Sequence, residues 1–277
     1  MTGASIDPFD RPDTQFNTLP NWTWIGCYGG YYLQSDLLQR AGFEHGFFTR
    51  LWQGREPDEL AGYISAGVSV HRPKQIHSGR VLAASNAQGA PWPEADGLVS
   101  DQGGQSLWVC GADCTPVLIA DPETGHAAAC HAGWRGVASR ILPEAIRQLE
   151  THGAKRSELL VAFGPAVSGK EYQVGDDVVD AISNSLGAGA GPSESEEISQ
   201  RLQDTKVLLP DDEPGRHRLD IRGAAALQLQ QHGLDSEQIS TCPLCTLSEP
   251  NLFHSWRRDQ VKAVQWSGIV AQALATI

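Results

Sequence analysis

Residues 115–134 read TPVLIADPETGHAAACHAGW, in which two apolar runs flank a polar turn. Such a pattern predicts a β-hairpin with strands at 116–121 and 126–131. In the register that the turn sets, Cys114 lies two residues beyond the position opposite His131. Residues opposite or diagonal across a strand pair are about 5–8 Å apart. The hairpin alone therefore brings these two side chains to the same end of a sheet.

A thiolate and an imidazole placed in this way suit Zn²⁺, which takes sulfur and nitrogen ligands. Cys114 and His131 are therefore candidate metal ligands, and a third ligand must come from elsewhere in the chain. His77 in the segment KQIHSG is one candidate and His71 is its rival. His126 is excluded, because about 16 Å of strand, at roughly 3.3 Å per residue, separates it from His131. The alternative interpretation is that these side chains only pack or face solvent.

The hairpin ends in HAGWRG, which places two glycines, a tryptophan and an arginine just before a predicted helix. Backbone N–H groups at a helix N-terminus bind anions, and glycine lets a ligand approach the backbone closely. We therefore expect a phosphate-sized anion beside the metal, although the same glycines also suit a tight strand-to-helix turn. The candidate anion contacts are Gly133, Arg135, Arg50, Arg257 and Arg258.

Strand-like and helix-like segments alternate along the rest of the chain. HGFFTR at 45–50 predicts a strand, and 65–85 predicts two strands around a turn at Arg72–Pro73. After the hairpin, apolar residues over 137–149 follow helical spacing, and Pro143 marks a point where this helix begins or kinks. Strands and helices joined by short loops predict a single α+β domain, with helices covering a mixed or antiparallel sheet.

The domain is expected to span residues 21–277. Residues 1–20 are polar and contain three prolines, a composition typical of a loose lead-in. GAGAGPSESEE at 187–197 combines small and acidic residues, which predicts an exposed, flexible insertion within the domain.

Composition limits the partners and the location of the protein. The 277 residues carry a formal charge of −12, which disfavours nucleic-acid and anionic membrane partners. No run of 18 apolar residues occurs, and the first residues lack the basic and apolar parts of a signal peptide. Six cysteines are too few for a disulfide scaffold. We expect a cytoplasmic protein, whose oligomeric state the sequence leaves open.

The sequence lacks the motifs of several enzyme classes. Neither a phosphate-binding GxxxxGK loop nor a GxGxxG after a strand is present, and the GxSxG of serine hydrolases is missing. Cys242 and Cys245 form a CxxC, but one such pair cannot complete a tetrahedral zinc site. We interpret this pair as structural.

Taken together, these motifs are similar to the YfiH or laccase-domain family, also called the multicopper polyphenol oxidase or purine nucleoside phosphorylase family. ADC and HAGWRG carry the resemblance most specifically, and HGFFTR, KQIHSGRV, DGLVSDQGG and HSWRRD also occur in the family's order. The resemblance covers most of the chain. It implies a four-layer α-β-β-α fold with mixed sheets, and a zinc ion bound by His77, Cys114 and His131.

The resemblance also implies an activity on purine nucleosides. Family members are associated with phosphorolysis of adenosine, inosine, guanosine and methylthioadenosine, and with adenosine deamination, so nucleosides and phosphate are the implied partners. The laccase label requires several copper sites, and the chain lacks the His-x-His pairs that these need. The family's Thr-Arg-x-Gly-Gly stretch is replaced by TRLWQG, which keeps Arg50 and changes the loop after it.

The resulting hypothesis is a catalytic zinc site with one open position. For phosphorolysis, phosphate held near the GWRG turn and Arg50 attacks the ribose; for deamination, an activated water attacks the purine ring. One alternative is a thiol hydrolase or amidase, with Cys114 as nucleophile and His131 or His77 as its base. Another alternative is a purine nucleoside sensor without catalytic turnover.

Overall fold

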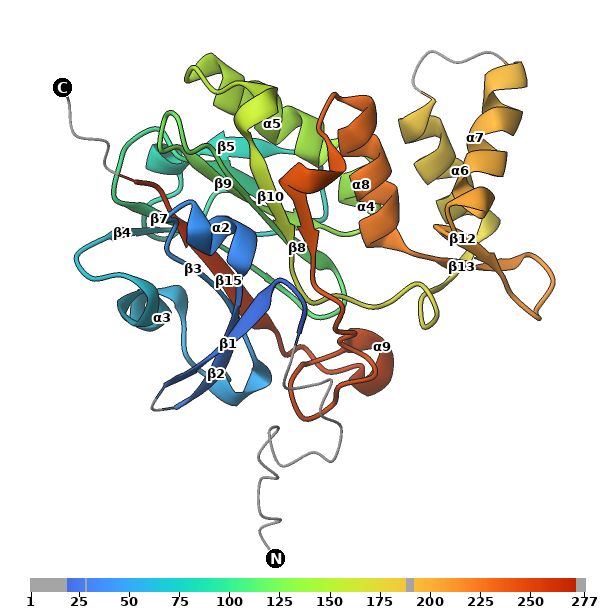
Figure 1. The fold of residues 1–277 in the computed structure, drawn as a ribbon. Coiled ribbons are helices and arrows are strands. Elements are labelled where there is room, and N and C mark those ends of the chain that lie inside the picture. The colour runs from blue at the N-terminus through green and yellow to red at the C-terminus, as the bar shows by residue number, and fades with distance from the viewer. Residues whose placement is uncertain (1–18, 28, 188–191, 273–277) are drawn as a thin grey trace, which may run out of the picture.

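The computed structural model describes residues 19–27, 29–187 and 192–272. The expected lead-in lies outside this part up to residue 18, and so do residues 188–191 of the expected insertion. Two six-stranded sheets form the centre of the molecule, and a small three-stranded sheet lies to one side (Figure 1).

The first sheet has the strand order β1-β2-β3-β15-β7-β4. Its neighbours are antiparallel except for β4, which pairs parallel to β7. The strands are β1 Trp22–Cys27, β2 Gly30–Ser35, β3 His45–Phe48, β15 Gln265–Val270, β7 Gln105–Gly111 and β4 Ser69–His71.

The second sheet has the order β14-β10-β8-β9-β6-β5 and is also mixed. Its centre is the predicted hairpin, and the predicted register is confirmed because Pro116 pairs with His131. The strands are β14 Ile239–Thr241, β10 Leu160–Phe163, β8 Thr115–Ala120, β9 Ala127–Ala132, β6 Gly97–Val99 and β5 Val81–Ala83. The small sheet contains β11 Gln173–Gly175, β13 Arg216–Leu219 and β12 Leu208–Pro210.

Helices cover the outer faces of both large sheets (Figure 1). Because strand side chains alternate, Val117 and Ile119 of β8 pack among helices, whereas Leu118 and Ala120 pack against the first sheet. The implied four-layer α-β-β-α arrangement is therefore confirmed. The helices are α2 Asp36–Arg40, α3 Pro57–Ile64, α4 Trp134–Ala138, α5 Ile141–Thr151, α6 Asp176–Leu186, α7 Pro192–Asp204, α8 Ile221–Gln231 and α9 Trp256–Asp259.

The helical pattern after the hairpin is divided into two helices. α4 ends at Ala138, and Arg140 then adopts a left-handed conformation with φ of 59° before α5 begins. Pro143 is the third residue of α5, where its missing N–H costs no intrahelical hydrogen bond. The break expected near this proline is confirmed.

The two strands expected within 65–85 are present as β4 and β5, but they belong to different sheets. The intervening segment 72–80 therefore crosses from one sheet to the other and does not form a local turn. His77 lies in this segment, between β4 and β5. The crossing depends on pairing with distant strands, so periodicity within the segment could not reveal it.

The expected flexible insertion at 187–197 is partly wrong. Helix α7 starts at Pro192, so the second half of that stretch is helical. Proline is favoured in the first turn of a helix, where its backbone nitrogen needs no partner. Among the described helices, none combines the length and the apolar character that crossing a membrane would require.

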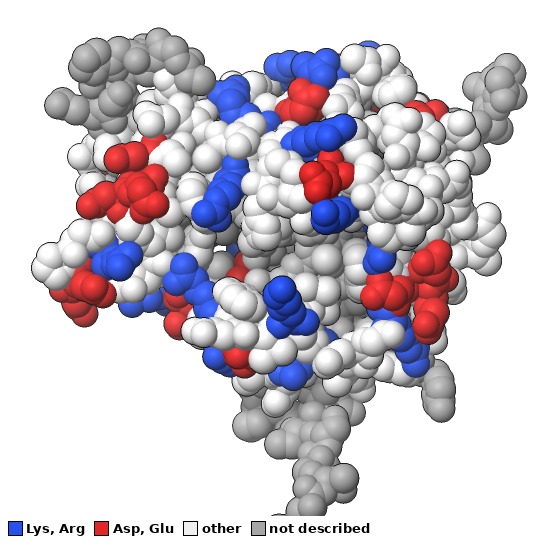
Figure 2. Space-filling model, turned by 180° about the vertical axis from the view of Figure 1, so that it is seen from behind, with Lys and Arg blue, Asp and Glu red and all other residues white. Residues whose placement is uncertain are grey.

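On the face shown in Figure 2, acidic side chains alternate with basic ones, and the Lys and Arg residues form no continuous patch.

Candidate metal centre

Three candidate ligands from separate elements converge at one end of the second sheet. The ligand atoms of His77, Cys114 and His131 all lie within 4.8 Å of one another. Cys114 lies in the tight connection from β7 to β8, His131 lies on β9, and His77 lies in the crossing segment. His77 itself has a left-handed backbone, with φ of 60°. The group could hold a metal ion.

Asp96 holds two of these ligands in place. Its carboxylate accepts hydrogen bonds from Nδ1 of His131 at 2.9 Å and from the backbone N–H of His77 at 2.9 Å. It also accepts the N–H and hydroxyl of Ser78 at 2.6 and 2.8 Å. A carboxylate behind a ligating imidazole fixes its tautomer and orientation, so Nε2 of His131 is left for the metal.

The sequence interpretation did not find Asp96. It lies just before β6, and the register of β6 with β9 places Gly97 opposite Cys130 and therefore Asp96 beside His131. The available signal was a carboxylate immediately ahead of a buried apolar strand, GLV. A fully buried charge in such a place requires partners, as it has here.

The electrostatics of the group favour ligand binding by the sulfur. Burial lowers the pKa of His131, but its hydrogen bond to Asp96 and its contact with Cys114 outweigh burial and raise the pKa to about 9. Burial raises the pKa of Asp96, and its bonds with His131 and Ser78 bring it down to about 2. Burial also raises the pKa of Cys114, while His131 and His77 lower it to about 6. The two imidazoles therefore favour the thiolate of Cys114, the form that binds metals and attacks electrophiles.

Gly133 is required by the closeness of its backbone to the sulfur. A Cβ atom at this position would lie 2.7 Å from Sγ of Cys114. Gly133 lies just before the five-residue helix α4. Because it has no side chain, it lets the backbone pass close to the sulfur of Cys114.

Replacing Gly133 by alanine is therefore expected to weaken metal binding at least about 10-fold, because the sulfur must move away from the imidazoles. Competition with a chromogenic chelator measures this affinity. The matched control is Gly62→Ala in α3, where a Cβ meets open space. That variant should bind metal normally and be more stable by about 0.5–1 kcal/mol. Equal metal affinity in both variants would show that the close approach has no role.

The three ligands open onto a cavity of about 600 Å³. Among the other side chains that line it, basic and aromatic groups are prominent. Basic groups come from Arg135, Arg257 and Lys262, and aromatic rings from Trp134, Tyr172 and Trp256. No fourth His, Cys, Asp or Glu joins the ligand group in the parts of the chain that the structure describes. One side of a bound ion would therefore face the cavity.

Asp113 connects the cavity-lining residue Arg257 with the segment that carries the candidate ligand Cys114. Buried next to Cys114, its carboxylate accepts the hydroxyl of Thr246 at 2.7 Å and the backbone N–H of Arg257 at 2.8 Å. Arg257 is thereby fixed at the start of α9, and its guanidinium lies over the ring of Tyr172, 4.5 Å from the centroid.

Comparison with known proteins identifies the family of this chain. A model of the family described as multi-copper polyphenol oxidoreductase laccase matches residues 58–273. The chain belongs to this family. A relative from Synechocystis, named purine nucleoside phosphorylase slr1573, is 40% identical over 259 residues, which cover 90% of this chain and 97% of the relative. Purine nucleoside phosphorylase YlmD of Bacillus subtilis is 35% identical over 60% of this chain and 55% of its own length.

Solved structures of the laccase family share the fold. The crystal structure of YlmD from Geobacillus stearothermophilus has a TM-score of 0.73 at 25% identity, covering 87% of this chain and 96% of the other. The Bacillus licheniformis protein YfiH has a TM-score of 0.72 at 23% identity. Although the family is named for multicopper enzymes, the described part of this chain gathers one group of three His and Cys ligands.

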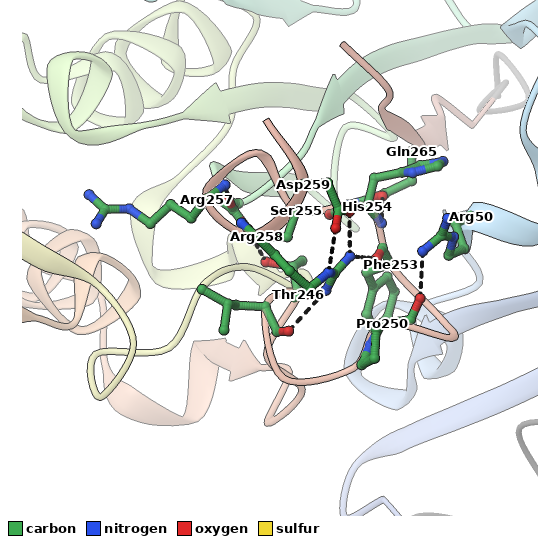
Figure 3. Close-up of polar contacts among 12 residues, drawn as sticks. Arg50, Thr246, Pro250, Phe253, His254, Ser255, Arg257, Arg258, Asp259 and Gln265 are labelled. Atoms are coloured by element: carbon green, nitrogen blue, oxygen red, sulfur yellow. Dashed lines mark hydrogen bonds and ion pairs between the residues drawn. The ribbon is translucent and has the colours of Figure 1, made fainter. Parts of the chain in front are cut away.

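Two arginines expected at the anion site of this family member lie elsewhere. Arg50 donates from Nη1 to the carbonyl of Pro250 at 2.6 Å and does not line the cavity (Figure 3). Arg258 donates to three carbonyl groups at 2.8–2.9 Å, those of Thr246, Leu247 and Phe253, and pairs with Asp259. Figure 3 shows Arg257 extending away from these partners. Of the predicted anion contacts, the cavity therefore receives Arg135 and Arg257.

The structure also separates the rival ligands. His71 is buried on β4, where its ring contacts the hydroxyl of Ser69 and the carbonyl of Ala84, so it does not join the ligand group. His126 lies at the turn end of the hairpin and contacts Ser100. It is not part of the ligand group, as predicted. Cys242 and Cys245 are both buried and form no disulfide, and neither is among the residues that line the cavity.

Proposed function

We propose that the chain is a zinc-dependent purine nucleoside phosphorylase whose site also deaminates adenosine. The observation that carries this proposal is the shared cavity: the His-Cys-His group opens onto about 600 Å³ that basic and aromatic side chains line. A volume of this size suits a small ligand such as a nucleoside. The relatives in Synechocystis and Bacillus are named purine nucleoside phosphorylases, which supports the choice of reaction.

Zinc fits the donor set formed by His77, Cys114 and His131. Two imidazole nitrogens and one thiolate, with a fourth position open to a cavity, are typical of catalytic rather than structural zinc sites. When bound, the ion supplies Lewis-acid chemistry to a reactant in the cavity. Asp96 orients His131 for this role, and the low pKa of Cys114 provides the deprotonated sulfur that zinc requires.

Arg135 and Arg257 are the proposed phosphate contacts. Neither has a carboxylate partner among the described residues, so both guanidinium groups remain available to an anion. In phosphorolysis, a phosphate oxygen bonds to the anomeric carbon of ribose while the bond from that carbon to the purine breaks. The purine leaves with the electron pair and takes up a proton from solvent, and ribose 1-phosphate remains. In deamination, water adds to the ring carbon and the amino group leaves as ammonia.

A thiol hydrolase is the second candidate, because one observation favours it. The sulfur of Cys114 and a ring nitrogen of His131 lie within 4.8 Å of each other, and the lowered pKa of Cys114 beside the raised pKa of His131 favours the thiolate and imidazolium pair that cysteine hydrolases use. The two candidates differ in their requirement for metal. A chelator stops the zinc enzyme, whereas alkylation of metal-free protein stops the thiol enzyme.

We place the protein in the cytoplasm. All six cysteines are free in the structure, which suits a reducing compartment. The Cys114 thiolate in particular would be oxidised readily elsewhere, since susceptibility follows thiolate character and access.

The test is to incubate purified protein with inosine and with adenosine, each with and without phosphate, and to separate the products. Inosine should give hypoxanthine and an equal amount of ribose 1-phosphate only when phosphate is present. Adenosine should give inosine without phosphate. Both reactions should stop with a chelator and return with added zinc. Release of base without phosphate, or turnover that survives chelation, would contradict the proposal.

A further inference from the structure

The exposed large apolar side chains of the described residues gather at the mouth of the cavity. They are Ile76, Trp256, Val261 and Val264. The last three line the cavity, and Ile76 directly precedes the ligand His77. Exposed apolar side chains scattered singly need no explanation, but a cluster at one opening indicates a surface that a ligand covers.

The three aromatic rings of the cavity are not equivalent. Trp134 carries the guanidinium of Arg135 at 4.3 Å from its ring centroid, and Tyr172 carries that of Arg257 at 4.5 Å. Trp256 has no ring or cation over it among the described residues and is 50% exposed. It also lines a neighbouring cavity of about 470 Å³, so its indole stands between two open spaces. Trp256 is therefore the ring whose face is available to a flat ligand.

The indole is held on a fixed support. Ser255 caps α9 through a hydrogen bond from the backbone N–H of Arg258, and the N–H of Arg257 is bonded to Asp113. Gln260 then turns the chain with a left-handed φ of 50°, which directs Val261 and Val264 back to the cavity. Because Asp113 is adjacent to the ligand Cys114, the position of Trp256 is set relative to the metal group.

We infer that Trp256, with Val261 and Val264, forms the face that binds the purine base. This inference rests on the proposed function and adds to it the residues that select the heterocycle. A purine is flat and has a π-face, and stacking on an aromatic side chain is the interaction that such a base makes without a specific hydrogen bond. Stacking on a half-exposed indole would let one site accept both 6-amino and 6-oxo purines, as the proposed function requires. The ribose and phosphate then lie toward Arg135, Arg257 and the metal ligands.

The first test compares three variants in the zinc-loaded enzyme. Trp256→Ala should raise KM for inosine about 10- to 100-fold, the usual range for loss of one base–aromatic stack. KM for phosphate and the zinc content should not change. Trp256→Phe should restore most of the affinity. Leu247→Ala is the matched control, because Leu247 lines the neighbouring cavity and is not among the residues that line the cavity of the ligand group. An unchanged KM for inosine in Trp256→Ala would overturn the inference.

A second test does not depend on turnover. Equilibrium dialysis measures the affinity of radiolabelled hypoxanthine for wild type and for Trp256→Ala. Loss of binding in the variant supports the inference even if the wild type performs no phosphorolysis, in which case only the proposed function fails. If the wild type phosphorolyses inosine and both proteins bind hypoxanthine equally, the inference fails and the proposed function stands. A wild type that binds no purine base overturns the inference.

Discussion

Replacing Cys114 by alanine should remove the bound metal and abolish turnover of every nucleoside. The sulfur is the one soft ligand of the group, and both imidazoles face it within 4.8 Å. Its loss should exceed the roughly 10- to 100-fold effects that are typical of residues behind the ligands. Metal content by plasma mass spectrometry and phosphorolysis of inosine measure the two outcomes in the same preparation.

The control for this variant is Cys110→Ala. Cys110 also lines the cavity, but burial raises its pKa to about 12, and its sulfur is not part of the ligand group. It should keep metal and activity. A Cys114→Ala protein that is metal-free and still turns over nucleosides would refute the metal mechanism. Loss of activity with metal retained would instead indicate the thiol nucleophile.

The second large effect is expected for Asp96→Asn. The amide presents an NH₂ group either to the Nδ1 hydrogen of His131 or to the N–H of Ser78, so one of these contacts becomes repulsive. Zinc affinity should fall about 10- to 100-fold. The measurement is a zinc titration against a chelator of known affinity, followed by an assay at saturating zinc.

Asp121→Asn is the matched control, since Asp121 is equally buried but serves the turn of the hairpin. It should lower stability while leaving zinc affinity unchanged. Partial recovery of the Asp96→Asn enzyme at high zinc is the signature of a residue that positions a ligand. If Asp96→Asn binds zinc as tightly as wild type, the carboxylate does not orient His131.

The hairpin could be predicted from sequence because its information is local. The turn between β8 and β9 sets the register, and the register alone brings Cys114 and His131 together. The break ahead of Pro143 was predictable for the same reason, because proline is tolerated only in the first turn of a helix.

Asp96 and Trp256 could not be predicted, because their roles depend on distant pairings. Asp96 reaches His131 only through the pairing of β6 with β9. Trp256 reaches the cavity because Asp113, far away in sequence, binds the N–H of Arg257. The sequence predicted the same anion-binding role for both arginines of the HSWRRD segment. In the structure, Arg258 instead donates hydrogen bonds to backbone carbonyl groups.

Stepwise addition of zinc to metal-free protein, with inosine phosphorolysis followed at each step, measures the dependence of catalysis on the His77, Cys114 and His131 group. Activity should rise in proportion to added zinc and stop rising at one ion per chain. Full activity before any zinc is added, or no activity at any zinc level, would contradict the account.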